Sequence, residues 1–151
     1  MDRLEALADA LMKLNGWADP ASQSYRNRNP LLLRAYSLTR RQEQDEQGVR
    51  VFASLPAGYY AGLNDLFEKC GGRSRAKLLR GQPLKNLLAV YGAGHPVVRR
   101  RVICFLRAAI PEAAGEIGDS TPLDWFLQSS ATPAETARRL RNAEAMEEAH
   151  D

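Results

Sequence analysis

Hydrogen-bonding side chains are concentrated in a loop that follows the first apolar segment of the chain. They are hydroxyl, amide, carboxyl and aromatic groups at short spacings: Trp17, Asp19, Ser22, Ser24, Tyr25, Asn27 and Asn29. Such groups can line a groove for a polar ligand, and a helix end that opens onto such a loop is a common place for one reactive side chain. We therefore expect a functional site at this junction.

An amphipathic helix is predicted to position this loop. Apolar residues recur at three- and four-residue steps, which is typical of one buried helix face over about residues 2–14: Leu4, Leu7, Ala8, Leu11 and Leu14. Asn15 and Gly16 then form a C-terminal stop signal, because both residue types tolerate the left-handed backbone.

The remaining pattern predicts a mainly α fold with a small β-element. The alternating, β-branched residues 49–52 favour a short strand or half of a small hairpin. Proline, glycine and capping residues delimit further helices at about 56–70, 84–91, 96–110 and 121–127. We expect one domain over residues 1–130, followed over 131–151 by an Ala-rich C-terminal helix or tail that is loosely docked or frayed.

Size and charge suit one globular domain with a polyanionic partner. The 151 residues are 44% hydrophobic and 26% charged, which is enough to bury a core. The net charge of +3 is carried mainly by residues 26–50 and 69–107. It suits a cell-wall polymer or a nucleic acid without choosing between them, and it is equally compatible with a role in solubility.

No export or membrane signal is found in the sequence. Acidic residues interrupt the apolar positions of the N-terminus, and no apolar run approaches membrane-spanning length. The sequence predicts synthesis in the cytoplasm and no membrane span, so that action at a cell wall would need release or export by other means. Cys70 and Cys104 fall on apolar helix faces and are expected to be buried free thiols.

Metal and cofactor sites are not indicated. His95 and His150 have no His, Cys or acidic partner at ligand spacing. The Gly92-Ala93-Gly94 segment is too short for a phosphate-binding loop, and it follows a predicted helix rather than a strand. We therefore expect no metal and no cofactor.

Several segments follow one another in a defined order along the chain. The first two are Leu14-Asn15-Gly16-Trp17 and Ser24-Tyr25-Arg26-Asn27-Arg28-Asn29-Pro30-Leu31-Leu32-Leu33-Arg34. The later ones are Asp45-x-x-Gly48-x-Arg50-Val51-Phe52-x-Ser54, Gly58-Tyr59-x-Ala61-x-Leu63-x-Asp65-Leu66 and Leu84-x-x-Leu87-x-x-Val90-Tyr91-Gly92. From about residue 4 to residue 106, the chain thus resembles the lysozyme-like domains of the lytic transglycosylase and phage endolysin group.

The resemblance implies a lysozyme-like helical domain that binds peptidoglycan, and Asn15 stands where the group has its catalytic Glu. Cleavage of a glycosidic bond needs a carboxylic acid that protonates the leaving oxygen, which an amide cannot do. The Gly-Asn pair that follows the Pro in the group is replaced by Leu31-Leu32. We therefore expect a glycan-binding protein of phage or prophage kind with weak or lost lytic activity.

The resemblance and the loop together indicate candidate glycan-binding residues: Asn15, Trp17, Ser24, Tyr25, Asn27, Asn29 and Tyr91. Structural alternatives stand beside these roles. Asn15 suits a helix C-cap, Trp17 suits packing of the helix end on the core, and the other asparagines suit turns in which Asn bonds nearby backbone. Asp65 and Glu68 are expected on a solvated helix face.

Two other functions stay open. A recruited carboxylate, Asp19 or Asp45, would make the protein an active glycan-cleaving enzyme. The basic residues 73–80 and 99–101 would instead form a surface for nucleic acid. No helix-turn-helix spacing and no interleaved aromatic residues accompany these basic residues, which disfavours the nucleic-acid interpretation.

Overall fold

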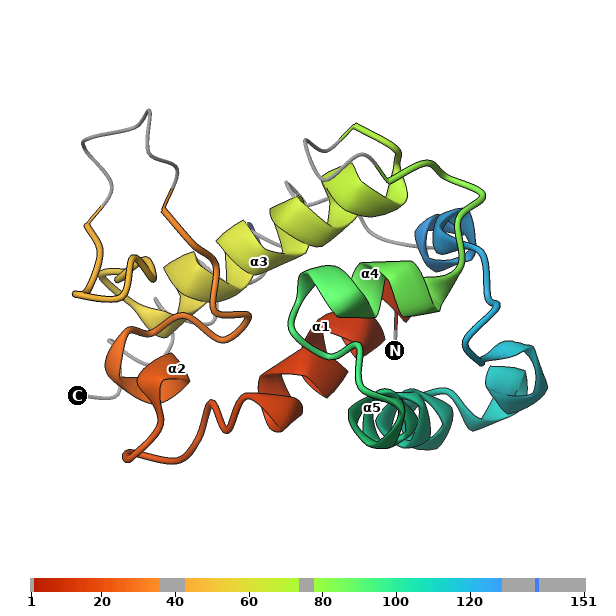
Figure 1. Cartoon of the computed structure of the whole chain (residues 1–151), viewed down its shortest axis with the longest axis horizontal. Helices are drawn as coiled ribbons and strands as arrows, with labels where there is room; N and C mark the ends of the chain where they lie inside the picture. The colour runs from red at the N-terminus through yellow and green to blue at the C-terminus, as the bar shows by residue number, and fades with distance from the viewer. Residues whose placement is uncertain (1, 36–42, 74–77, 129–137, 139–151) are drawn as a thin grey trace.

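The computed structural model describes residues 2–35, 43–73, 78–128 and residue 138, and it is mainly helical, as predicted (Figure 1). Within these residues the helices are α1 (Arg3–Leu14), α2 (Gln23–Arg26), α3 (Leu55–Cys70), α4 (Leu84–Val90) and α5 (Pro96–Ala109), followed by the 3₁₀ helices η1 (Pro111–Glu116) and η2 (Leu123–Leu127). In this described part of the chain, no helix is long and apolar enough to cross a membrane.

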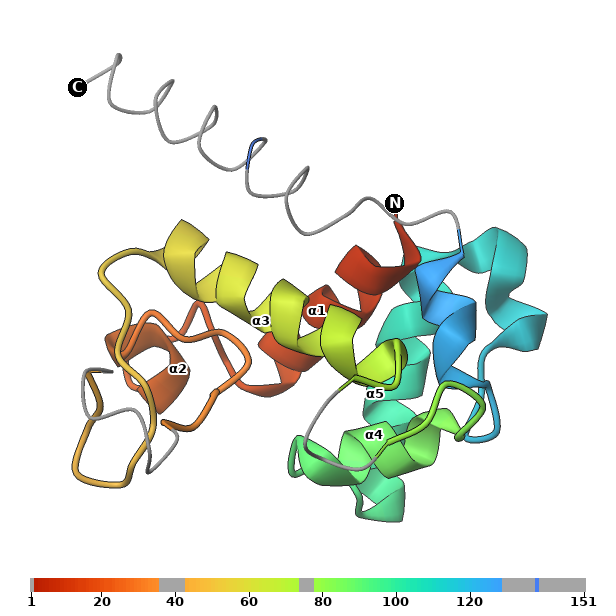
Figure 2. The ribbon, with the colours of Figure 1, turned by 90° about the horizontal axis from the view of Figure 1, so that it is seen from above.

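Helix α3 extends from one side of the molecule to the other. Figures 1 and 2 place α2 and the loops around it near the N-terminal half of α3, whereas α4, α5, η1 and η2 lie toward its C-terminal end. We call residues 17–35 and 43–54 the loop lobe, and α1, α4, α5, η1 and η2 the helical lobe. Helix α1 packs against α3, α5 and η2, so it lies at the centre of the helical lobe.

Helix α1 has the start and the end that its sequence predicts. The Asp2 side chain caps it by accepting hydrogen bonds from the backbone N–H groups of Leu4 and Glu5, at 2.9 and 3.2 Å. Asn15 is the C-cap, and Gly16 follows in the left-handed conformation with φ +68°. The leucines of the predicted apolar face are buried in the core, except for the partly buried Leu14.

Two glycines allow α3 to pack directly on the loop lobe. A Cβ atom at Gly58 would lie 1.9 Å from the carbonyl oxygen of Arg28, and one at Gly62 would lie 2.9 Å from Cδ1 of Leu31. Leu31 is buried and fills the space above Gly62. The absence of two side chains on α3 therefore sets the position of residues 28–31.

The predicted β-element is reduced to isolated bridges. Arg34 pairs with Val49, and Gln44 pairs with Arg50, both antiparallel, while no regular strand forms in the described residues of this region. Other groups take the partners that a longer ladder needs: the backbone N–H of Phe52 donates to the carbonyl of Asn27, and the Asn29 amide donates to the carbonyl of Arg50. The loop lobe is thus held by a few backbone hydrogen bonds, such as those from the N–H groups of Arg50 and Val51 to the carbonyls of Leu33 and Glu43, together with the Asn29 side chain.

Cys104 contradicts the expectation of two buried thiols. Cys70 is fully buried, and burial raises the pKa of its thiol to about 12. Cys104 is exposed, because Val102, Ile103 and Leu106 form the buried face of α5 and Cys104 lies outside that face. Both cysteines are free thiols.

The helix predicted after α5, over about residues 121–127, differs from its prediction in its type and its cap. It is the 3₁₀ helix η2, which begins at Leu123. The Thr121 hydroxyl does not cap it, but donates to the carbonyl of Glu116 and accepts from the N–H of Gly118, at 2.6 and 2.9 Å. The predicted C-terminal helix or tail and basic residues 74–77 lie outside the described residues, apart from residue 138.

The contact between α3 and the loop lobe predicts a large effect of one methyl group. We expect Gly58→Ala to lower the free energy of unfolding by about 3 kcal/mol, because the new Cβ must displace backbone. Gly115→Ala is the matched control, since a Cβ there meets no atom within 4 Å. Urea denaturation followed by circular dichroism measures both, and equal stabilities would contradict this packing.

Candidate functional site

A groove of about 1000 Å³ lies between the loop lobe, α3 and the end of α4. One wall consists of residues 31–35 with Val49 and Arg50. The α3 wall is one stripe of that helix, followed by Arg73 beyond its end: Tyr60, Ala61, Asn64, Asp65, Glu68, Lys69 and Arg73. The far wall is the C-terminal end of α4 and the turn after it: Ala89, Val90, Tyr91 and Gly92. A groove of this size, with both aromatic and hydrogen-bonding groups, is a candidate binding site.

Asn29 builds the loop wall of the groove from behind. Its side chain is fully buried, and its Nδ2 donates to the carbonyls of Leu33 and Arg50, at 3.0 and 2.9 Å. Its Oδ1 accepts from the N–H of Leu33 at 2.9 Å. All of these bonds are made with the backbone of the loop wall. Asn29 therefore positions that wall and does not line the groove.

Asn15 has a similar position behind the wall. Its side chain is half-buried, and Nδ2 donates to the carbonyl of Pro30 at 3.0 Å, directly before the wall begins at Leu31. Asn15 is not among the residues that line the groove. Asn15 therefore supports the wall from behind and does not face the groove.

Asp45 organises the outer part of the loop lobe. Its carboxylate accepts hydrogen bonds from the side chains of Asn27 and Gln23, at 2.8 and 2.7 Å, and from the backbone N–H groups of Gln47 and Val49. The bonds from Asn27 and Gln23 hold the pKa of this carboxyl well below its usual range. A general acid needs the opposite shift, so this environment does not suit Asp45 to proton donation.

A cluster on α3 links this helix to the end of α4. The Oδ2 atom of Asp65 accepts from both the Lys69 ammonium and the Tyr91 hydroxyl. Lys69 is 7% exposed, and its Nζ lies 5.0 Å from the centroid of the Tyr91 ring. Asp65 thus satisfies a nearly buried cation and fixes the aromatic ring of the far wall.

Further charged groups border the groove. Arg73 Nε lies 3.9 Å from a carboxylate oxygen of Glu68, and both side chains are exposed. Arg34 is exposed and donates to the carbonyl of Gln47, while the Arg50 guanidinium stacks on Phe52 at 4.5 Å. Because Lys69 is paired with Asp65, and Arg73 with Glu68, the arginines of the loop wall leave the groove with excess positive charge.

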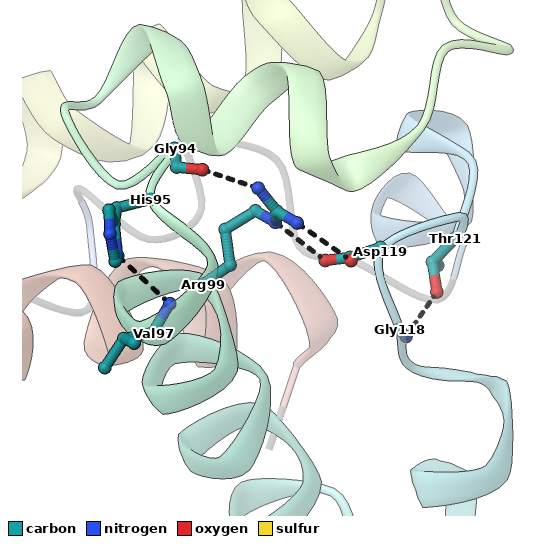
Figure 3. Close-up of polar contacts among 7 residues, drawn as sticks. All are labelled: Gly94, His95, Val97, Arg99, Gly118, Asp119 and Thr121. Carbon is teal, nitrogen blue, oxygen red and sulfur yellow. Dashed lines mark hydrogen bonds and ion pairs between the residues drawn. The ribbon is translucent and has the colours of Figure 1, made fainter.

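Polar contacts behind α4 fix the far wall (Figure 3). Arg99 donates to the carbonyl of Gly94 and to both carboxylate oxygens of Asp119, at 3.1 and 3.3 Å for the latter. His95 caps α5, because its Nδ1 accepts from the N–H of Val97 at 3.2 Å. The turn that follows Tyr91 is therefore tied to the segment before η2.

The other predicted site residues lie outside the groove. Trp17 packs against the core, and Ser24 is buried, its hydroxyl having no hydrogen-bond partner among the described residues. Tyr25 is 49% exposed on α2, and Asp19 is exposed and accepts from the N–H of Ala21. Of the candidate glycan-binding residues, the groove lining includes Tyr91.

The carboxyl of Asp9 has a raised pKa, as a general acid needs, but it does not line the groove. Burial raises the pKa of Asp9, which lies on α1 and accepts a 3.4 Å hydrogen bond from the Tyr59 hydroxyl. Tyr59 packs against the core, whereas the adjacent Tyr60 lines the groove. Asp9 therefore faces a different side of α3 from the ligand-sized space.

Sequence reasoning missed the α3 wall. It predicts a solvated face for Asp65 and Glu68, and it assigns no role to Tyr60 and Lys69. One signal was available: the groove-facing residues of α3 recur at four-residue steps, as one helix face requires. The sequence pattern alone does not give the position of the loop wall opposite that face.

The chain matches no protein-family model, no curated protein and no solved structure.

Asp45 predicts a specific pH dependence of stability. Its pKa is lower in the folded than in the unfolded protein, so it contributes stability above about pH 4 that is lost as the pH falls toward the folded pKa. We expect Asp45→Asn to lower the melting temperature at pH 7, and the two melting curves to converge under acid conditions. Thermal melts between about pH 2 and 7 test this.

Asp19→Asn is the control for this experiment. Asp19 is exposed, and its single hydrogen bond to the N–H of Ala21 can also be accepted by the amide oxygen of Asn. The control should have nearly the melting temperature of the wild type at pH 7. A difference between Asp45→Asn and wild type that does not change with pH would contradict the role assigned to Asp45.

Proposed function

We propose that this chain is a lysozyme-like domain that binds peptidoglycan glycan strands in the groove, with weak or lost cleavage activity. The observation that carries the proposal is the groove itself, which lies between a loop lobe and a helical lobe joined by α3. It is open and combines two tyrosines with amide, carboxylate and guanidinium groups. Aromatic faces can stack on sugar rings, while the polar groups bond hydroxyls.

The backbone of the loop wall supports the resemblance to lysozyme-like domains. Leu32 has φ +54°, a left-handed conformation that is unfavourable for leucine and readily adopted by asparagine. The resembled group has Asn at this position, after a Gly at the position of Leu31. The backbone at Leu32 thus has a conformation that suits the residue type of that group, which supports the proposal.

The charge of the groove also suits this ligand. Peptidoglycan carries carboxylates on its peptide stems, or on its lactyl groups where the stem has been removed, and Arg34 and Arg50 on the loop wall supply complementary charge. Cleavage lacks support from the same geometry. Asn15 cannot donate a proton as an acid, and Asp65 in the groove already accepts from Lys69 and Tyr91.

Two exposed tyrosines test where a glycan binds. Tyr60 lines the groove and is 37% exposed, whereas Tyr25 is 49% exposed and lies outside it. We expect Tyr60→Ala to weaken binding to soluble peptidoglycan strands by up to about tenfold, since stacking on an aromatic ring is worth about 0.5–1.5 kcal/mol, and Tyr25→Ala to have little effect. Isothermal titration calorimetry measures both affinities.

The converse result would move the site to the loop around α2. Absence of binding by the wild type would remove the cell-wall proposal altogether. Salt-dependent binding of duplex DNA in place of peptidoglycan would then support the nucleic-acid function.

A turbidity assay on purified cell walls tests the loss of cleavage. We expect no rapid clearing by the wild type, and no gain in Asn15→Glu, because residue 15 lies behind the wall. The variant should instead lose about 1 kcal/mol of stability with its hydrogen bond to Pro30. Clearing by the wild type that disappears in Glu68→Gln or Asp19→Ala would identify a recruited carboxylate, and clearing gained by Asn15→Glu would place residue 15 in the cleft.

A further inference from the structure

The outer side of α5 has a surface that the groove does not use. Val97, Arg100, Arg101, Cys104 and Phe105 line a shallow hollow of about 340 Å³. Val97 is 54% exposed, and Cys104 is also exposed, so the centre of this surface is apolar and accessible. These residues recur at three- and four-residue steps along one side of the helix, which is the spacing of a helix docking face.

Cations surround this hollow. Helix α5 contains four arginines and no acidic residue. Two of the arginines are engaged with the fold, because Arg99 bonds Gly94 and Asp119 (Figure 3) and Arg107 bonds the carbonyl of Ile117. Arg100 and Arg101 are exposed and have no hydrogen bond or ion pair with any residue that the structure describes.

A third cation comes from α1. Lys13 is exposed, and its Nζ lies 5.7 Å from the centroid of the Phe105 ring at the edge of the hollow. Three cations thus border an apolar surface. Arg100 and Arg101 form no hydrogen bond or ion pair with a described carboxylate, whereas Lys13 interacts electrostatically with Asp9 on α1, so the two arginines carry most of the free positive charge. Such a surface matches a ligand with an apolar side chain between carboxylates.

We infer that the outer face of α5 is a docking surface for an acidic amphipathic helix of another protein, which inserts an apolar side chain between Arg100 and Arg101. The hollow favours a peptide over a lipid surface, because a concave site takes single inserted side chains. The face is separate from the glycan groove, since the two share no lining residue. Docking there leaves the groove free.

The test uses a fluorescein-labelled peptide of Glu, Ala and Leu in which leucines recur at helical spacing and glutamates flank them. Fluorescence anisotropy of the full-length protein should show saturable binding. We expect the double variant Arg100→Glu/Arg101→Glu to weaken it by about tenfold or more, and to bind a matched peptide with Lys in place of Glu more tightly than the wild type does.

Two controls separate this site from general charge attraction. Lys85→Glu, on the exposed side of α4, removes a cation that does not line the hollow and should leave the affinity nearly unchanged. A second peptide, in which alanines replace all leucines, should bind the wild type at least about tenfold more weakly, because the apolar contact is missing. Melting temperatures confirm that each variant is folded.

The reactivity of Cys104 reports directly whether the peptide binds in the hollow. Its thiol is exposed in the hollow, whereas Cys70 is buried with a raised pKa, so N-ethylmaleimide should modify Cys104 first. Bound peptide should slow this modification. Three outcomes would each overturn the proposal. The peptide binds but leaves Cys104 unprotected, or it binds the charge-reversed variant as tightly as the wild type. In the third, the protein binds phosphatidylglycerol vesicles but not the peptide.

Discussion

The close approach of α3 to residues 28–31 is the constraint on which the rest of the structure depends. Gly58 and Gly62 let the helix touch the loop backbone and the Leu31 side chain without an intervening layer. This contact sets the distance between the two long walls of the groove. It also explains why the loop lobe is well defined although its described residues form no regular strand: the loop packs directly on α3, and the Asn29 amide bonds supplement the few backbone hydrogen bonds between its segments.

The side chains that suggest a binding loop mostly face inward. Asn15 holds Pro30, Asn29 holds Leu33 and Arg50, and Asn27 holds the Asp45 carboxylate. A buried amide costs free energy unless its donors and acceptor are paired, and each of these amides is paired with a group that shapes the wall. In this protein, the polar residues after α1 thus support the groove from behind, and residues from α3 and α4 provide much of its surface.

The helices were predictable and the groove was not, for physical reasons. The ends of α1, α3, α4 and α5 follow local rules: caps, glycines and prolines act within a few residues. Helix α2 and the 3₁₀ helix η1 are too short for apolar periodicity to predict them, although Ser22 caps α2 and Pro111 begins η1. The pairing of Asp65 with Tyr91 joins residues that are far apart in sequence, and the outward position of Cys104 depends on which face of α5 meets α1. Those facts belong to tertiary packing, which a single sequence specifies only indirectly.

Because α3 contributes to both lobes, the two lobes share one folding transition. The N-terminal half of the helix touches residues 28–31, and its C-terminal half buries Leu66 and Cys70 in the core. Local opening of either lobe removes contacts that hold the same helix, so the cost of opening rises toward that of global unfolding. Amide hydrogens along the middle of α3 should accordingly be among the slowest to exchange with solvent deuterium.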